Sequence, residues 1–309
     1  MTPTQTRLGP AELNDVLGLM LDVTGRAPSQ DELEWLFERN PAGAGIVSSA
    51  TEHGQLAGVI GTIFATAVTP AGLTRIAFPV NAVTKVELRR HGIFSALELR
   101  SEELAAAQGA TLGIAFPNVT RSTFVGRLGW TDVRSMRIWA RVLHPLRLLR
   151  RAGGGGFGTR SDTDIRRFES VHEEAWLAVQ PAWGSCVARG VDHLNWRYLD
   201  SPRGYRVFGV DGCYAVIRHI EHKRVSAAAI CELVGPPRAQ RRLLRRCLHE
   251  ARNGADVALG VPAAGQRAAY AALGFVPTPI VIRVVGKSLS EDVSLPRSWF
   301  FSLGDTDFI

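Results

Sequence analysis

Long hydrophobic runs are missing from this 309-residue sequence, and none approaches the roughly 20 apolar residues that a membrane-spanning helix needs. The first residues also lack the basic-then-apolar plan of a secretory signal peptide. We therefore expect a protein that spans no membrane and works in the cytoplasm. Apolar residues nevertheless make up 46% of the sequence, and the length allows two domains that each bury a hydrophobic core.

Cysteine is scarce, and its positions exclude the usual frameworks. All four residues lie in the C-terminal half, and no two have the Cys-x-x-Cys spacing of a zinc site or a redox motif. They are Cys186, Cys213, Cys231 and Cys247. We expect buried, reduced thiols and no bound metal.

Lysine is rarer still and occurs only at Lys85, Lys223 and Lys287. Lys and Arg together number 36, so nearly all of these residues are arginine. Arginine therefore carries almost all of the positive charge behind the net charge of +7. Guanidinium groups suit polyanions such as the phosphates of a cofactor, an acidic carrier protein or nucleic acid. No nucleic-acid-binding motif accompanies the charge, so we expect no nucleic-acid partner. The alternative is that the arginine content reflects only codon usage in a GC-rich genome.

The stretch from 75 to 130 has the clearest organisation. It reads as an apolar strand over 75–85, a basic turn over 89–95, a helix to 107, a strand over 111–116 and a short helix ending at 128–130. A strand that feeds a glycine-containing turn and then a helix directs several unpaired N–H groups, and the positive end of the helix dipole, at one point. Such a point attracts phosphate.

This stretch resembles the acyl-coenzyme A (acyl-CoA) binding core of the GCN5-related N-acetyltransferase (GNAT) superfamily. That core carries Arg/Gln-x-x-Gly-x-Gly/Ala after a strand and, further on, an Asn followed by Leu-Gly-Phe. Arg89, Gly92, Asn118 and Leu128-Gly129-Trp130 match the pattern in order and spacing, and Thr84 lies five residues before Arg89. The resemblance implies an α/β fold with a mixed, mostly antiparallel sheet, and acyl-CoA as co-substrate.

By the same resemblance, the end of the strand and the turn hold the acyl-CoA. A backbone N–H near Ala82 and Val83 would polarise the thioester carbonyl. The residues so assigned are Ala82, Val83, Thr84, Lys85, Arg89, Arg90, His91, Gly92, Ile93, Phe94, Ser95 and Asn118.

Two positions depart from the superfamily pattern. Phe94 stands where a second small residue is expected, and a side chain there limits how closely a pyrophosphate approaches the backbone. It also fits a donor other than acetyl-CoA, such as a longer acyl chain or an acyl carrier protein. Val125 stands where many members carry the tyrosine that protonates the leaving thiolate.

The groups that would move protons are the least defined. The central strand offers no carboxylate, only Asn81, whose amide can orient a water molecule or the nucleophile. We name Asn81, Tyr270 and Asp305 as catalytic candidates, with His53 and Glu232 as further candidates for the base. Tyr270 equally fits a core position, and Asp305 equally fits a solvated tail.

The first half of the chain recurs in the second. Residues 35–43 align without a gap on 196–204, with matching tryptophan, aromatic, proline and glycine positions. Leu128-Gly129-Trp130 likewise aligns on Leu273-Gly274-Phe275, which places Tyr270 in register with Val125. Because the order of expected elements repeats as well, we infer a duplication.

We therefore predict two tandem GNAT-like domains, at 1–143 and 161–309, joined by a basic, glycine-rich linker at 144–160. The second copy has Pro236 and Pro237 in place of the phosphate-binding turn. Because proline lacks a backbone N–H, we expect this copy to bind no acyl-CoA.

The tandem plan also resembles that of N-myristoyltransferase-type and mycothiol-synthase-type proteins, in which one half holds the donor and the other helps to shape the acceptor site. This resemblance places the acceptor near Trp35, Arg39, His193, Trp196 and Tyr198. The aromatic residues of this group fit simple packing as well.

These patterns predict an N-acyltransferase that moves an acyl group from acyl-CoA to an amine of a small metabolite, amino sugar, amino acid or peptide. The alternatives are a non-catalytic acyl-CoA-binding or scaffold protein, a transferase that takes its acyl group from an acyl carrier protein, and an enzyme of this fold that makes an ester or decarboxylates a thioester. The sequence does not indicate the oligomeric state.

Overall fold

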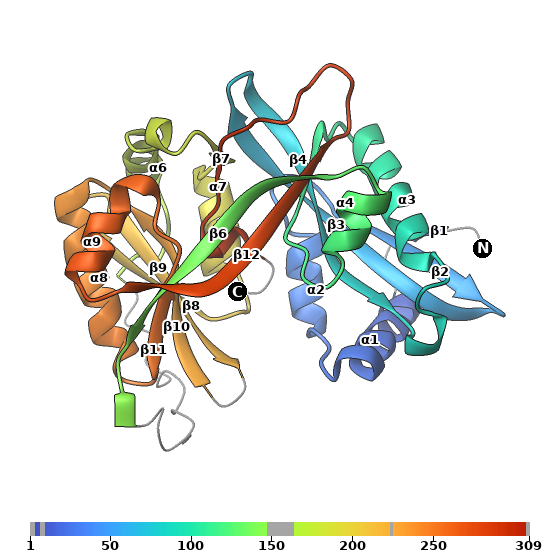
Figure 1. The fold of residues 1–309 in the computed structure, drawn as a ribbon, viewed down its shortest axis with the longest axis horizontal. Coiled ribbons are helices and arrows are strands. Elements are labelled where there is room, and N and C mark those ends of the chain that lie inside the picture. Colours follow the sequence, from blue (N-terminus) through green and yellow to red (C-terminus); the bar gives the residue numbers. More distant parts are fainter. Residues whose placement is uncertain (1–3, 7–9, 147–163, 223–224, 307–309) are drawn as a thin grey trace. The chain divides into compact units, whose positions relative to one another are not determined.

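The computed structural model describes residues 4–6, 10–146, 164–222 and 225–306. These residues contain 13 strands, paired mostly antiparallel, with helices packed on them, so the predicted mixed α/β fold is confirmed (Figure 1). The chain divides into two compact units. Unit 1 contains Met1–Arg134 and Arg283–Arg297, and unit 2 contains Ser135–Ile282 and Ser298–Ile309.

Unit 1 begins with a short strand and two helices, and a helix follows each of the two strands that pair in parallel. Its elements are β1 (Thr4–Thr6), α1 (Pro10–Thr24), α2 (Gln30–Phe37), β2 (Ile46–Glu52), β3 (Gln55–Thr69), β4 (Gly72–Thr84), α3 (Ile93–Ala107), β5 (Leu112–Ala115) and α4 (Arg121–Arg127). β1 to β4 pair antiparallel, and β5 joins β4 in parallel. At the start of α2 the Ser29 hydroxyl accepts the Glu32 N–H at 3.1 Å, as expected of a Ser-x-x-Glu capping pattern.

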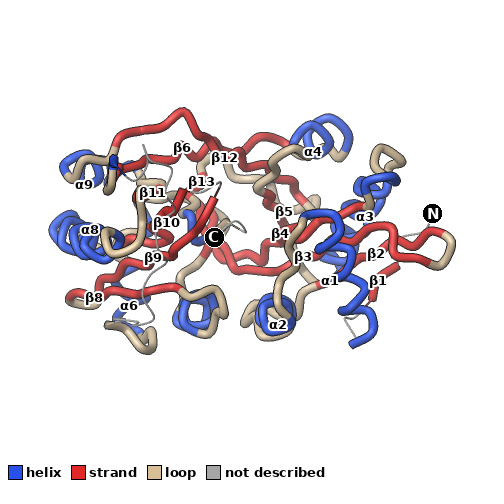
Figure 2. Tube along the Cα trace, turned by 90° about the horizontal axis from the view of Figure 1, so that it is seen from below, coloured by secondary structure: helices blue, strands red, loops and turns tan. Residues whose placement is uncertain are grey.

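Helices α1 and α3 cover opposite faces of the unit 1 strands (Figure 2). Val59 of β3 packs in a cluster with Met20 of α1. Its neighbour Ile60 packs with Leu97 of α3. Successive residues of a strand point to opposite faces, so the end of β4 is bordered by α1 on one face and by α3 on the other.

A strand from the other half of the sequence completes each unit. β12 (Val276–Ser288) ends in unit 1, where Val285 pairs with Ala115 of β5. β6 (Thr131–Val142) ends in unit 2, where Val142 pairs with Val257 of β11 (Val257–Gly260). Each exchanged strand covers the open edge of a short parallel strand, whose backbone groups would otherwise lack ladder partners on that side.

Each unit therefore contains residues from both halves of the sequence, whereas the predicted domains divide the chain at single positions. The linker expected at 144–160 lies outside the described residues from 147 onward. The domains expected at 1–143 and 161–309 stay a prediction.

Unit 2 repeats the element order of unit 1. Its elements are α6 (Ser170–Leu177), β7 (Ser185–Val187), α7 (Val191–Leu194), β8 (Tyr205–Val210), β9 (Cys213–His222), β10 (Val225–Val234), α8 (Pro237–Ala251), β11, α9 (Arg267–Ala272) and β13 (Trp299–Phe300). β10 pairs antiparallel with β9 and parallel with β11, as β4 does with β3 and β5. The two units therefore share a pattern of strand pairing, and the duplication inferred from the sequence stays a prediction.

All four cysteines are free and buried, as expected. Burial raises the pKa of the Cys186 thiol to about 11 and that of Cys247 to about 12, so both thiols stay protonated at neutral pH. Within the described parts of the chain, no group of three or more His, Cys, Asp or Glu side chains could hold a metal ion. No helix among those residues is long and apolar enough to cross a membrane.

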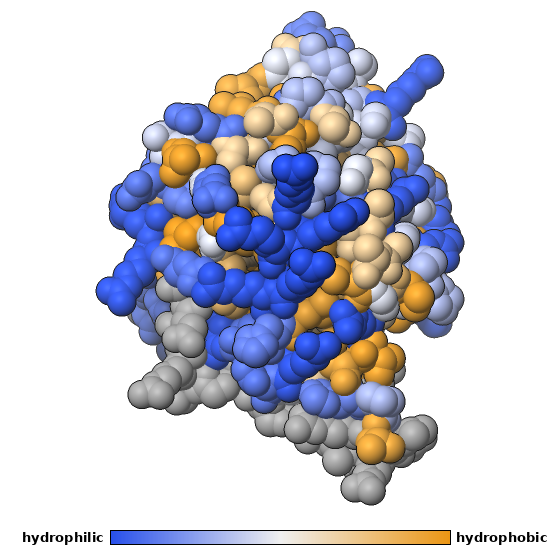
Figure 3. Space-filling view, turned by 90° about the vertical axis from the view of Figure 1, so that its left-hand side faces the viewer, coloured by the Kyte–Doolittle hydropathy of each residue, from blue (hydrophilic) through white to orange (hydrophobic). Residues whose placement is uncertain are grey.

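The outer face of α8 is basic. Figure 3 shows hydrophilic side chains gathered on the side of unit 2 that carries this helix. The exposed arginines of α8 are Arg238, Arg241, Arg242, Arg245 and Arg246.

Candidate functional site

A β-bulge interrupts β4 at the residues assigned to the thioester carbonyl. On β3, Val59 and Gly61 are two residues apart, whereas their partners on β4, Val83 and Val80, are three apart. The extra residue falls at Asn81–Ala82, and Asn81 has the left-handed backbone angle φ of 52°. Because a bulge turns backbone groups away from the regular ladder, this part of β4 can present an N–H to a ligand.

The parallel strands β4 and β5 separate just before the bulge. Within the described residues their ladder contains only the pairs Ile76 with Leu112 and Ala77 with Gly113. On its other side β4 stays paired with β3 as far as Thr84 and Gly58. The last third of β4 therefore keeps one partner strand and has an edge without ladder bonds toward β5, where an extended ligand can bind.

The turn after β4 leads into the start of α3. Arg90 and Gly92 both have left-handed backbone angles, with φ of 69° and 81°. A methyl group added at Gly92 would meet no atom within 4 Å, so the turn is open. The first backbone hydrogen bond of α3 runs from Ala96 N–H to the Gly92 carbonyl at 3.0 Å, so the N–H groups of 93–95 precede it. Such a helix start, with exposed basic residues before it, is suited to a phosphate.

Phe94 does not stand alone in this turn. Its ring packs edge-on against Phe124 of α4, with centroids 5.5 Å apart at 77°. Phe124 in turn packs edge-on against Trp130 at 4.9 Å. The aromatic side chain at position 94 is therefore part of the packing between α3 and α4, while the backbone of the turn stays open at Gly92.

The other residues assigned to acyl-CoA lie along the same strand end and loop. Ala82, Arg89, His91 and Asn118 are exposed. The Lys85 N–H already donates to the Ala57 carbonyl at 3.0 Å, so it belongs to the strand pairing.

A small cavity, with space for a group of about the size of a water molecule, borders the bulge on the face of α1 and α2. Asn81 is one of its walls, and the rest of the lining is apolar. That lining consists of Val16, Met20, Leu33, Phe37, Val47, Val59 and Gly61. The catalytic candidate Asn81 thus lies between the bulge and an apolar cavity.

The acceptor residues expected in unit 1 have different environments. Trp35 is fully buried in the core, whereas Arg39 is exposed and pairs with Asp31 at 2.5 Å. The burial of Trp35 favours packing, the alternative that the sequence left open.

In unit 2 a buried ionic cluster holds the remaining candidates. Arg189 pairs with Glu232 at 2.9 Å and with Asp305 at 2.7 Å. The hydroxyls of Tyr198 and Ser302 both donate to Glu232 Oε1 at 2.8 Å. Burial alone would lower the pKa of Arg189, but the two carboxylates hold it well above its usual value. Asp305 is therefore the partner of a buried guanidinium in this structure, and the solvated tail is excluded for it.

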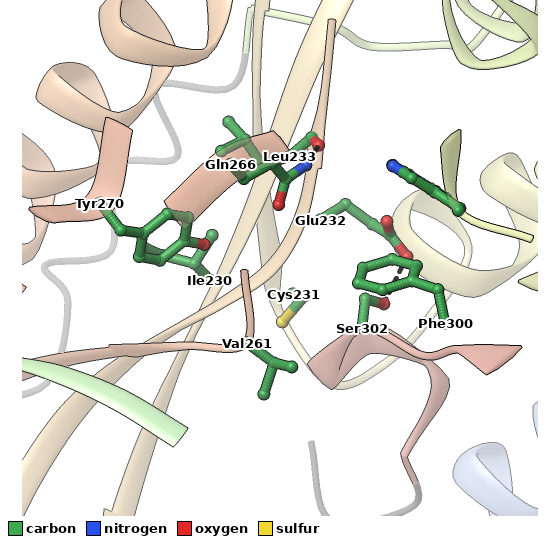
Figure 4. Close-up of a pocket in the computed structure, with 10 residues that line it drawn as sticks. Ile230, Cys231, Glu232, Leu233, Val261, Gln266, Tyr270, Phe300 and Ser302 are labelled. Atoms are coloured by element: carbon green, nitrogen blue, oxygen red, sulfur yellow. Dashed lines mark hydrogen bonds between the residues drawn. The ribbon is translucent and has the colours of Figure 1, made fainter. Parts of the chain in front are cut away.

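The cluster adjoins a small cavity in unit 2, with space for a group of about the size of a water molecule (Figure 4). Glu232 and Ser302 line it on one side, and Tyr270 and Gln266 line it on another. Tyr270 is only 1% exposed, and burial raises its pKa far above the usual value. A phenol in that environment keeps its proton at neutral pH.

The other expected acceptor residues of unit 2 are also enclosed. Trp196 and Tyr198 are buried. Burial, with the charges of Arg189 and Arg197, lowers the pKa of His193 to about 3, so its ring is neutral at physiological pH. These side chains shape the interior of unit 2, and their role in binding an acceptor stays a prediction.

Sequence reasoning missed two features of these sites. Arg189 gave no signal because it is one arginine among many, and only the fold brings it between two carboxylates. Glu98 of α3 is 2% exposed, and burial, together with the charge of Glu102 and against that of Lys287, raises its pKa to about 8. The sequence indicates the burial of Glu98 only by its position, one turn after Phe94 and next to Leu97 on the helix.

Comparison with known proteins agrees with the fold. No protein-family model matches the sequence, and no curated protein matches it. A probable N-acyltransferase from Enterococcus faecalis V583, otherwise of unknown function, matches with a TM-score of 0.62 at 13% identity, over 94% of this chain and 73% of that one. A GCN5-related N-acetyltransferase from Kribbella flavida matches with a TM-score of 0.63 at 13% identity, over 93% and 71%.

A third structure, a GCN5-related N-acetyltransferase from Anabaena variabilis ATCC 29413, matches with a TM-score of 0.65 at 10% identity, over 93% of this chain and 73% of that one. The chain therefore has the GNAT fold, as the resemblance of residues 75–130 predicts. At these identities the likeness concerns the fold alone.

Proposed function

We propose that the protein is an N-acyltransferase that moves an acyl group from acyl-CoA to an amine, with the donor bound in unit 1. The observation that carries this proposal is the bulge at Asn81–Ala82 on a strand that leads directly into an open, basic turn at Gly92. The end of β4 thus combines three features that an acyl-CoA site needs. They are a turn suited to a phosphate, a strand edge without ladder bonds, and a backbone N–H at the bulge.

The residues present fit an acyl-CoA. The N–H groups of 93–95 would hold the diphosphate, with Arg89 and Arg90 adding charge. The edge of β4 would bind the pantetheine arm, and the Ala82 N–H would donate a hydrogen bond to the thioester carbonyl oxygen. The amine nitrogen attacks that carbonyl carbon, the C–S bond breaks, and the thiolate leaves with the electron pair and takes up a proton.

The acceptor approaches, in this proposal, from the face of α1 and α2. Asn81 is the polar group of the cavity on that face, and its amide can orient the amine without accepting its proton. The remaining walls among the described residues are apolar, and the space between them admits only a small group such as the amine itself. Among the described residues no carboxylate lines that cavity, so the amine is proposed to arrive deprotonated or to lose its proton to water.

A charge placed in the turn tests the donor site. Gly92→Glu puts a carboxylate beside the diphosphate and should weaken acyl-CoA binding by at least about a hundredfold, because like charges in one site cost several kcal/mol. Gly109→Glu is the matched control, since Gly109 ends the same helix with a left-handed φ of 83° and open space around it. Calorimetric titration with acetyl-CoA should show an unchanged affinity for the control. If Gly92→Glu binds as tightly as the native protein, the turn is not the donor site.

A second candidate function is supported by the absence of a proton donor at position 125. Val125 is 37% exposed on α4, where the superfamily pattern has its tyrosine, so acyl-CoA binding without turnover is the alternative. A thiol reagent that reports free coenzyme A, in the presence of a panel of amines, separates the two. Release of thiol that depends on the amine supports the transferase, and binding without release supports a scaffold.

A carrier protein is the alternative donor, because its pantetheine arm is the same and also ends in a phosphate. The exposed arginines of the turn would then meet an acidic protein surface. Transfer from acyl-CoA alone, without carrier protein, argues for the free thioester.

A further inference from the structure

A second cavity lies on the α3 face of the strands that form the donor site. The space between its walls admits a group of about the size of a water molecule. Its walls include Ala77 and Gly113, the last pair of the β4–β5 ladder, and Pro79 just beyond that pair. The cavity therefore lies where the two strands begin to separate.

Two buried polar atoms at this cavity have no hydrogen-bond partner within the described residues, Thr62 Oγ1 and Glu98 Oε2. Their residues are 3% and 2% exposed. Buried polar groups are almost always paired, so two unpaired ones at one small cavity call for an explanation.

The other polar side chains of the lining are satisfied. Ser101 donates to the Ser48 hydroxyl at 2.9 Å. Glu102 accepts from Trp130 Nε1 at 2.7 Å and from Lys287 Nζ at 2.5 Å. Thr62 and Glu98 are thus the two groups of this cavity that remain available to a ligand.

The direction of the bound donor follows from the proposed function, on which this inference rests. If the diphosphate lies at the turn and the carbonyl at Ala82, the thioester runs back along β4 from its end toward its middle. The acyl group beyond the carbonyl then points toward Pro79 and Ala77, which are walls of this cavity.

We propose that this cavity receives the tip of the acyl group, and that the donor is a short acyl-CoA whose acyl tip carries a hydroxyl group. Thr62 and Glu98 would hydrogen-bond that hydroxyl. A long alkyl chain does not fit the available space, and a methyl group of the same size would leave both polar atoms unpaired.

The state of Glu98 agrees with this role. Burial, reinforced by Glu102 and opposed by Lys287, raises its pKa to about 8, so the side chain is a neutral acid at pH 7. A neutral carboxylic acid can both donate and accept a hydrogen bond, as a hydroxyl ligand requires.

Two pairs of donors that differ only by a hydroxyl in place of a methyl group test the proposal. They are hydroxyacetyl-CoA against propionyl-CoA and 3-hydroxypropionyl-CoA against butyryl-CoA, titrated at pH 7 without acceptor. In one of the pairs the hydroxyl member should bind about tenfold more tightly or better, since a buried polar group left unpaired is unfavourable by more than the small difference in apolar burial.

Variants of the two residues make the result specific. Thr62→Val and Glu98→Met keep the volume and remove the polar atoms, and the double variant should bring the ratio to within about twofold of unity. Thr62→Ser keeps the hydroxyl and should keep the preference. Circular dichroism of each variant checks that the fold is retained.

The outcomes separate this inference from the proposed function. If no acyl-CoA of the panel binds, the donor site itself is wrong and the inference falls with it. If all bind but neither pair shows a preference, or if the double variant keeps the preference, the donor site is retained, but the cavity does not bind the tip of the acyl group.

Discussion

The raised pKa of Glu98 leads to a prediction that can be tested without a substrate. It lies on α3 in the interior of unit 1, 2% exposed, and burial, with Glu102 adding and Lys287 opposing, raises its pKa from 4.5 to about 8. Replacing it by Gln keeps the shape and removes the titration. The stability of the Glu98→Gln variant relative to the native protein should therefore depend on pH.

The sign follows from proton binding. The folded state holds the proton of Glu98 more tightly than the unfolded state, so the stability that goes with the protonated acid is fully present below pH 4.5 and is lost as the pH rises through about 8. A shift of about 3.5 pKa units corresponds to about 5 kcal/mol, at about 1.4 kcal/mol for each unit. That figure is the total change expected between acidic and alkaline solution.

Urea unfolding of both proteins at several pH values between about 5 and 9 measures the effect. Relative to the native protein, Glu98→Gln should gain several kcal/mol of unfolding free energy between the two ends of that range. Glu103→Gln is the control, because that side chain is on the same helix, 66% exposed and paired only with Arg100. Infrared spectra at pH 7 should also show the band of a protonated carboxyl in the native protein and its loss in Glu98→Gln. A free-energy difference that stays within about 1 kcal/mol over the whole range would refute a buried neutral acid.

Three further substitutions probe unit 2. Tyr270→Phe should change turnover by only a few-fold, and a loss of about a thousandfold in steady-state assays would move catalysis into unit 2. Gly304→Ala would place a methyl group against the Tyr198 hydroxyl, so we expect a loss of about 1–3 kcal/mol in urea unfolding, whereas Gly265→Ala, which meets no atom within 4 Å, should have little effect. Arg189→Met leaves its two carboxylate partners buried without a cation and should cost about 3–5 kcal/mol by the same measurement, and a neutral result would show that the carboxyls are protonated.

Much of the fold could be predicted because it depends on local patterns. The strand expected over 75–85 is found as β4 (Gly72–Thr84), the helix expected to end at 107 is α3 (Ile93–Ala107), and the strand expected over 111–116 is β5 (Leu112–Ala115). Alternating and helical apolar periods report which face of an element is buried, and turn residues report where elements end. The recurrence of aromatic, proline and glycine positions then predicts two related units.

The exchange of β6 and β12 between the units could not be predicted in this way. Both strands carry ordinary strand patterns, and nothing in 131–142 or 276–288 states which edge each will join. Strand pairing is decided by which edges remain open after the rest has folded, and that is a property of the whole chain.

The backbone conformation of the candidate site could be predicted from the sequence. The burial and pairing of its carboxylates could not. The open turn at Gly92 follows from glycine spacing, and the structure gives it the left-handed angle that glycine tolerates. The titration of Glu98 and the pairing of Asp305 depend on how deeply each carboxylate is enclosed and on which charges lie beside it. Those quantities are set by residues far away in the sequence, so a carboxylate in a helix or a tail reads as solvated until the fold is known.

The two units differ at the residues that the proposed donor site uses. Both have a bulge on the central strand, at Asn81–Ala82 in β4 and between Ile230 and Glu232 in β10, so they do not differ there.

The difference lies in the turn and in what fills the opening beyond it. In unit 2 the helix starts at Pro237, which has no N–H to offer a phosphate, and Pro236 precedes it. The ring of Tyr270 lies against Gly260, the last residue of β11 to pair with β10, while Ser302 reaches Glu232 from the C-terminal segment. In unit 1 the corresponding turn is open at Gly92. We therefore expect unit 2 to bind no acyl-CoA, because its turn has prolines where a phosphate needs backbone N–H groups.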